Sequence, residues 1–169
     1  QGRVVDTPGD NILAEFSSAL NAVYSAVEIQ RTLENENGKL PDNRRMEFRM
    51  GINLGDILHK DDRIYGDGVN VAARIEGLAD PGGICISRGV FGQVRKKVPQ
   101  GFEYLGEHTV KNITQPVTIY RVLLAPEYEG RVIGEPESHS AKMSRPTAIA
   151  IGMIVLASVV FFWVVYSPP

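Results

Sequence analysis

Residues 66–76, GDGVNVAARIE, predict a short helix with one apolar face and one polar face. Val71 and Ile75 are one turn apart, so we expect them to pack together against a sheet. Asn70 and Arg74 are one turn apart on the polar side, where an amide and a guanidinium could bind phosphate or ribose oxygens. A solvated polar face without a ligand is the alternative interpretation of this pattern.

The flanking segments predict the rest of an α+β domain. Pro8-Gly9 suits a tight turn between two strands, and the strict alternation around Met50 indicates a strand with one buried face. In chain order we expect a hairpin over 2–16, helices over 17–37, 67–79 and 88–96, and strands over 46–54, 83–87, 102–110 and 117–124. This order favours a mostly antiparallel sheet with helices packed on one face.

The composition is that of a folded protein. Of the 169 residues, 43% are apolar and 22% are charged, and the formal net charge is −2. This balance argues against a strongly basic nucleic-acid binder, so we expect no nucleic-acid partner. The single cysteine, Cys85, lies in the apolar run GICIS and is expected to be buried and unreactive. His59, His108 and His139 are scattered and predict no metal site.

The C-terminal part of the chain changes in composition. An uncharged run of 20 residues begins at Thr147, and 20 helical residues span about 30 Å, the thickness of bilayer hydrocarbon. Lys142 and Arg145 precede this run, so the positive-inside rule predicts a cytoplasmic N-terminal domain. We therefore expect a single-pass membrane protein with a folded domain over 1–125, a linker over 126–146, a transmembrane helix over 147–166 and a tail over 167–169.

Four stretches together resemble the class III adenylate/guanylate cyclase catalytic domain. They occur in the family's order and span nearly all of residues 2–123: GRVVDTPGDNILAEF, MEFRMGINLGDI, IYGDGVNVAARIE and VKNITQPVTIYRV. The resemblance is to the bacterial, membrane-tethered type, which implies the bacterial inner membrane. It also implies a ferredoxin-like palm whose first strand would precede Gln1. Family members dimerise head to tail, so the expected partner is a second copy or a related cyclase chain.

The resemblance assigns a role to several residues. Asp10 matches the second of two aspartates that hold two Mg²⁺ or Mn²⁺ ions, and the first aspartate would lie upstream of Gln1. A turn aspartate of purely structural importance is the alternative. Asn70 matches the residue that orients the ribose, Arg74 the residue that stabilises charge on the triphosphate, and Lys111 a phosphate-contacting lysine. The implied reaction converts ATP to 3′,5′-cyclic AMP and pyrophosphate.

Two purine-reading positions depart from the family pattern. Asp6 stands where adenylate cyclases of this class usually have a lysine, and Arg63 stands where they often have an aspartate or threonine that accepts from the adenine amino group. We predict that Asp6 and Arg63 form an ion pair at the floor of the purine pocket, which would weaken or abolish selectivity for adenine. In an alternative reading, Asp62 contacts the base after a one-residue shift of the loop.

These departures leave two classes of function open. One is a nucleotidyl cyclase, which the matching Asp10, Asn70 and Arg74 favour. The other is a catalytically silent, cyclase-like module that dimerises or binds nucleotide to regulate a partner, which Asp6 and Arg63 favour. A generic membrane-anchored adaptor would require four ordered motifs to arise by coincidence.

Overall fold

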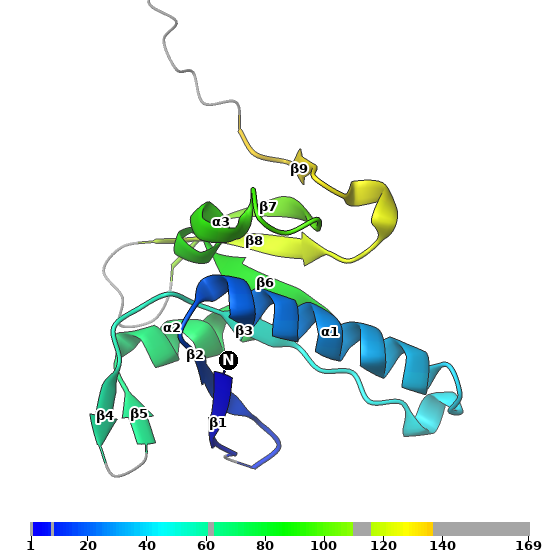
Figure 1. Cartoon of the computed structure of the whole chain (residues 1–169), viewed down its shortest axis with the longest axis horizontal. Helices are drawn as coiled ribbons and strands as arrows, with labels where there is room; N and C mark the ends of the chain where they lie inside the picture. The colour runs from blue at the N-terminus through cyan, green and yellow to red at the C-terminus, as the bar shows by residue number, and fades with distance from the viewer. Residues whose placement is uncertain (1, 8, 61–62, 110–115, 137–169) are drawn as a thin grey trace, which may run out of the picture. The chain divides into compact units, whose positions relative to one another are not determined.

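The computed structural model describes residues 2–7, 9–60, 63–109 and 116–136 (Figure 1). All but the last of these residues lie in the first of two compact units, residues 1–135. The elements in chain order are β1 (Gly2–Asp6), β2 (Leu13–Phe16), α1 (Ala19–Asn37), η1 (Asp42–Arg44), β3 (Met50–Ile52), β4 (Leu58–Lys60), β5 (Arg63–Tyr65), α2 (Asp67–Glu76), β6 (Ile84–Ser87), α3 (Arg88–Val94), β7 (Gly101–His108), β8 (Val117–Leu123), η2 (Pro126–Tyr128) and β9 (Val132–Ile133).

A five-stranded sheet in the order β3-β6-β8-β7-β9 forms the centre of the domain. The β6–β8 and β7–β8 pairs are antiparallel, whereas β3–β6 and β7–β9 are parallel. The fold is therefore α+β, as predicted, with a mixed sheet.

Helices cover both faces of this sheet, and the expectation of helices on one face is wrong. Side chains alternate along β6: Ile84 and Ile86 pack with α1 and α3, while Cys85 packs with Val71 and Ile75 of α2. Because successive strand residues point to opposite faces, the fully buried run ICIS needs a helix on each side. Such a run cannot be distinguished by periodicity from a strand buried on one face only.

Helix α1 begins as its sequence predicts. The Ser18 hydroxyl accepts a hydrogen bond from the backbone N–H of Asn21 at 3.2 Å, which caps the first turn. The face of α1 that contains Val23 and Val27 is buried in the core. In the same core cluster the ring of Phe91 stacks on Tyr120 with centroids 3.8 Å apart.

Helix α2 rests directly on the backbone of β3. A Cβ atom at Gly51 would lie 2.2 Å from the Glu76 nitrogen and 2.3 Å from the Ala72 carbonyl oxygen, so only glycine fits. A second close approach joins Gly55 to Gly68, where a Cβ at Gly55 would lie 2.9 Å from the Gly68 Cα atom. The glycines of GINLGD and GDG therefore allow the helix and the strand to pack without intervening side chains.

The strand expected over 46–54 is shorter than its alternating pattern indicates. Only Met50–Ile52 pairs in the sheet, and Met46 and Leu54 are exposed. The side chain of Gln30 donates to the Phe48 carbonyl at 2.8 Å, and Asn37 donates to the Met46 carbonyl at the same distance. Side chains of α1 thus satisfy backbone groups that a longer strand would pair.

Two small hairpins lie apart from the central sheet. The predicted hairpin over 2–16 is confirmed, because β1 and β2 pair antiparallel from Gly2–Phe16 to Asp6–Leu13. A second hairpin, formed by β4 and β5, was not predicted. Figure 1 shows both hairpins projecting on the same side of the domain.

The folded unit continues into the segment that was expected to be a linker. After η2, strand β9 pairs in parallel with β7, joining Phe102 to Val132. The hydroxyl of Tyr120 then donates to Glu135 Oε1 at 2.8 Å. Turn-forming Gly and Pro residues favoured a linker here, whereas a two-residue strand is too short to give a sequence signal.

The predicted fold class included a C-terminal transmembrane helix, and that part is corrected. In the residues that the structure describes, no helix has the length and hydropathy needed to cross a membrane. The longest of them, α1, has 19 residues and contains charged side chains such as Glu28 and Arg31. Residues 147–166 lie outside the described ranges. The fold assigned to the described residues is therefore the α+β domain, and no membrane helix is part of it.

Candidate active site

Asp6 and Arg63, which were predicted to stand at the purine-reading positions, lie together where the hairpins meet. Asp6 ends β1 and Arg63 begins β5, and Arg63 Nε is 4.0 Å from Asp6 Oδ2. The predicted ion pair between them is therefore present. The Asp6 side chain is 40% exposed and that of Arg63 is 65% exposed, so solvent screens the pair and a ligand can reach it. Asp62 lies outside the described residues.

Asp10 lies at the turn between β1 and β2 and is exposed. Among the described residues, no three His, Cys, Asp or Glu side chains are grouped so that they could hold a metal ion. One exposed carboxylate still suits Mg²⁺, which keeps several waters and is commonly bound by one or two carboxylates together with substrate phosphates. Asp10 thus fits a metal that arrives with a triphosphate.

The polar face of α2 presents the other candidate residues. Asn70 and Arg74 are exposed one turn apart, while Val71 and Ile75 on the opposite face are buried. The helix start is fixed by Asn53, whose amide donates to the Gly68 carbonyl at 3.1 Å. An amide and a planar guanidinium are therefore held on a rigid element and directed away from the core.

Asp10 belongs to the β1–β2 hairpin, whereas Asn70 and Arg74 belong to α2. In the part of the chain that the structure describes, no hydrogen bond or ion pair links Asp10 to Asn70 or Arg74. All three side chains are exposed, so each remains accessible to a second chain. Lys111 lies outside the described residues.

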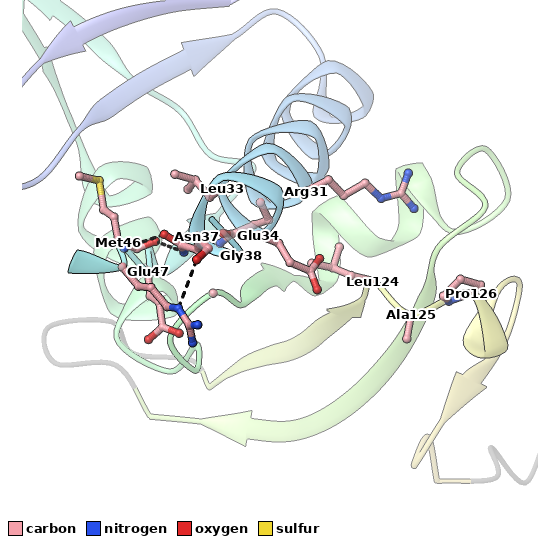
Figure 2. A pocket seen from close by; sticks show the side chains of 13 residues that line it. Arg31, Leu33, Glu34, Asn37, Gly38, Met46, Glu47, Leu124, Ala125 and Pro126 are labelled. Atoms are coloured by element: carbon pink, nitrogen blue, oxygen red, sulfur yellow. Dashed lines mark hydrogen bonds between the residues drawn. The ribbon is translucent and has the colours of Figure 1, made fainter. Parts of the chain in front are cut away.

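A large hollow of the described surface lies elsewhere. A cavity of about 650 Å³ lies between the C-terminal half of α1, residues 45–47 and residues 124–126. Figure 2 shows Arg31, Glu34 and Leu124 around it. None of the candidate residues lines this cavity, so it is not the site that the sequence indicates.

Cys85 takes no part in a reactive site. The thiol is fully buried between β3 and β8, and burial raises its pKa to about 11. The neutral thiol is a poor nucleophile at physiological pH. The prediction that this cysteine is buried and unreactive agrees with its environment.

Comparisons with known proteins identify the domain. The crystal structure of an adenylate/guanylate cyclase/hydrolase from Silicibacter pomeroyi is 41% identical in sequence, with 72% of each chain covered and a TM-score of 0.69. The chain belongs to the class III adenylate/guanylate cyclase family. A protein of Rhizobium meliloti named "Putative adenylate cyclase 3" is 49% identical over 120 residues, which are 71% of this chain.

A more distant cyclase shares the fold. The adenylyl cyclase CyaB from P. aeruginosa is 23% identical, with 75% of this chain and 74% of the other covered and a TM-score of 0.61. No protein-family model matches the chain. This cyclase domain corresponds to only 20% of the length of the Rhizobium meliloti relative.

The β4–β5 hairpin, which places Arg63 beside Asp6, was not predicted. A usable signal was present, because polar Asp61-Asp62 lies between the short runs LHK and RIY. No role in this site was predicted for Arg3 or Glu15, and His59 was considered only as a metal ligand. These three side chains contact one another across the two hairpins.

Proposed function

We propose that this chain is the catalytic domain of a nucleotidyl cyclase that converts ATP to 3′,5′-cyclic AMP and pyrophosphate at the interface between two cyclase chains. The observation that supports this most strongly is the exposed pair Asn70 and Arg74 on α2, in a chain that belongs to the cyclase family. Both residue types match those expected for ribose orientation and for charge stabilisation.

The reaction is an intramolecular substitution at phosphorus. The ribose 3′-hydroxyl loses its proton to water, its oxygen forms a bond to the α-phosphorus, the bond from that phosphorus to the bridging oxygen breaks, and pyrophosphate leaves. The amide of Asn70 would hold the ribose so that its 3′-oxygen is close to the phosphorus. The guanidinium of Arg74 would donate to phosphate oxygens as negative charge develops on them. Lys111 would add a further positive charge to the phosphates.

Asp10 would hold Mg²⁺ or Mn²⁺ in this site. The exposed carboxylate can contact an ion that is also bound to the triphosphate. When bound there, such an ion supplies positive charge to the phosphates and to the attacking oxygen. The family pattern requires a second aspartate and a second ion.

A second chain would complete the site. Asp10 and the pair on α2 are exposed, and no hydrogen bond or ion pair among the described residues links them, as expected if each contributes to a different half of an interface. A homodimer or a pair with a related cyclase chain would bring the halves together.

The Asp6–Arg63 pair favours GTP as a second candidate substrate. A carboxylate only accepts hydrogen bonds and a guanidinium only donates them. Position 63 is where the family reads the adenine amino group, and there a guanidinium would place donor against donor. Guanine instead offers the O6 acceptor to Arg63, and its N1–H and N2–H groups can donate to Asp6.

The proposal is tested by assaying the full-length protein with Mn²⁺ and either ATP or GTP. We expect cyclic nucleotide and pyrophosphate in equal amounts. Arg74→Ala should lower kcat by about 100-fold or more, because it removes a charge that acts in the transition state. Arg95→Ala, an exposed arginine near α3, is the matched control and should retain activity.

The silent-module hypothesis predicts a different result from the same assay. Nucleotide or partner binding would then persist, but no cyclic product would form with either nucleotide. Unchanged kcat in Arg74→Ala would also contradict the assigned role of this side chain.

A further inference from the structure

Three polar side chains, Arg3, Glu15 and His59, gather where the β1–β2 hairpin meets the β4–β5 hairpin. We call these residues the hairpin cluster. Arg3 Nε donates to Glu15 Oε1, and Arg3 Nη2 lies 3.4 Å from His59 Nδ1. His59 Nε2 lies 3.5 Å from Glu15 Oε2. The cluster is thus a closed ring of contacts between β1, β2 and β4.

Side chains provide the polar links between the two hairpins. Each hairpin forms its own two-stranded sheet, and in the described residues no backbone ladder joins β1–β2 to β4–β5. The hairpin cluster and the Asp6–Arg63 pair connect them. The ladder of the second hairpin pairs His59 with Ile64, and Ile64 directly follows Arg63. The position of His59 therefore affects the position of Arg63.

Glu15 requires a hydrogen-bond donor at its second oxygen. Oε2 is shielded from solvent, and no hydrogen bond with good geometry reaches it within the described residues. A shielded carboxylate oxygen without a donor is costly. The nearby nitrogen, His59 Nε2, can donate if the proton is on that nitrogen. His59 Nδ1 would then accept from Arg3.

We propose that the hairpin cluster positions Arg63 relative to Asp6. Arg3, Glu15 and His59 are then positioning residues for the choice of purine base. This inference rests on the proposed function, because it concerns the base selectivity of that same site. Selectivity between GTP and ATP should therefore decline when the contacts of His59 with Arg3 and Glu15 are removed.

Two substitutions at His59 separate positioning from simple loss of structure. His59→Gln keeps a donor and an acceptor at similar places. His59→Ala removes both contacts. Lys39→Ala removes an exposed ion pair with Glu36 at the far end of α1 and is the matched control.

The first measurement is the ratio of kcat/KM for GTP to that for ATP, in the full-length protein with Mn²⁺ at pH 8. We expect the ratio to be about fivefold lower in His59→Ala than in the wild type and in Lys39→Ala. His59→Gln should keep the ratio of the wild type. A His59→Ala ratio equal to that of the wild type overturns the proposal, as does a His59→Gln ratio as low as that of His59→Ala.

The second measurement needs no catalysis. Amide hydrogen exchange of β4 and β5 at pH 8, corrected for intrinsic rates, should be faster in His59→Ala than in the wild type, His59→Gln or Lys39→Ala. Equal exchange in all four proteins overturns the proposal. If the wild type cyclises neither nucleotide, the proposed function fails, while this measurement still decides whether the cluster holds the hairpins together.

Discussion

Helix α2 and the paired hairpins both contain candidate site residues, but the protein holds them in different ways. On α2, the buried Val71 and Ile75 and the contact with Gly51 fix the helix against the sheet. The hairpins lie outside the sheet and are joined by the partly exposed pair Asp6–Arg63 and by the hairpin cluster. The residues assigned to phosphate and ribose are thus anchored by close packing, whereas the residues assigned to the base are anchored by polar side chains.

This difference separates the stability of the domain from the base selectivity proposed for it. Core packing is costly to disturb, but exposed ion pairs contribute little to the free energy of unfolding, typically about 0 to 1 kcal/mol. Substitutions at positions 6 and 63 can therefore change base selectivity without unfolding the domain. A change on the buried face of α2 would affect folding and catalysis together.

The largest effect should come from breaking the close contact under α2. Gly51→Ala places a Cβ atom 2.2 Å from the Glu76 nitrogen, so the helix must move. We expect a loss of about 3 kcal/mol in the free energy of unfolding, with a matching loss of activity. Urea unfolding measures the first quantity.

Gly92→Ala in α3 is the control for this substitution. No atom lies within 4 Å of a Cβ there, so alanine should stabilise the helix by about 0.5–1 kcal/mol. Equal stability changes at the two glycines would contradict the described contact between α2 and β3.

A smaller effect is expected from exchanging the charges of the hairpin pair. Asp6→Lys combined with Arg63→Asp restores the family pattern for adenine, so kcat/KM for ATP relative to GTP should rise about tenfold. The midpoint of thermal unfolding should hardly change, because both side chains are partly exposed. Competition assays with both nucleotides measure the ratio.

The matched control exchanges another exposed pair. Asp42→Lys combined with Arg45→Asp alters an ion pair of 2.8 Å at η1, away from both hairpins. This variant should leave the nucleotide ratio unchanged. An unchanged ratio in the hairpin exchange itself would remove Asp6 and Arg63 from the purine-reading positions.

The smallest effect is expected for chemical labelling of Cys85, which packs beneath α2. Since burial raises the pKa of this thiol from 9.0 to about 11, the thiol contributes stability that is present below pH 9 and is lost as the pH rises to about 11. At pH 8 iodoacetamide should therefore not label the folded protein, although it should label the protein in urea. Mass spectrometry measures the labelling. Rapid labelling of the folded protein would show that α2 readily moves away from the sheet.

Much of the fold could be predicted from local patterns. Ser18 as an N-cap, the β1–β2 turn at Gly9 and the amphipathic α2 each follow from chemistry within a few residues. The second helix-covered face could not be predicted, because the run ICIS has no periodicity that reveals what covers it. The short β4 and β9 strands were missed for a similar reason, since two or three residues give no clear pattern.

The sequence predicts which residues belong to the candidate site better than it predicts how those residues are arranged. The Asp6–Arg63 contact was predicted because opposite charges had replaced two positions that act together. The hairpin cluster was not, because Arg3, Glu15 and His59 are distant in sequence and meet only when both hairpins form. Among the described residues no hydrogen bond or ion pair links Asp10 to the pair on α2, so no pattern within one chain can show how they would combine.

The pairing of β9 with β7 has a consequence for truncation of this protein. A chain cut after Ala125 would lose the Arg131 carbonyl that accepts from the Phe102 N–H at 2.8 Å, and the outer edge of β7 would be open. Open strand edges recruit other chains and lead to aggregation. The buried Tyr120 hydroxyl would also lose its partner Glu135. Soluble expression of the isolated domain should therefore require an end point beyond residue 135.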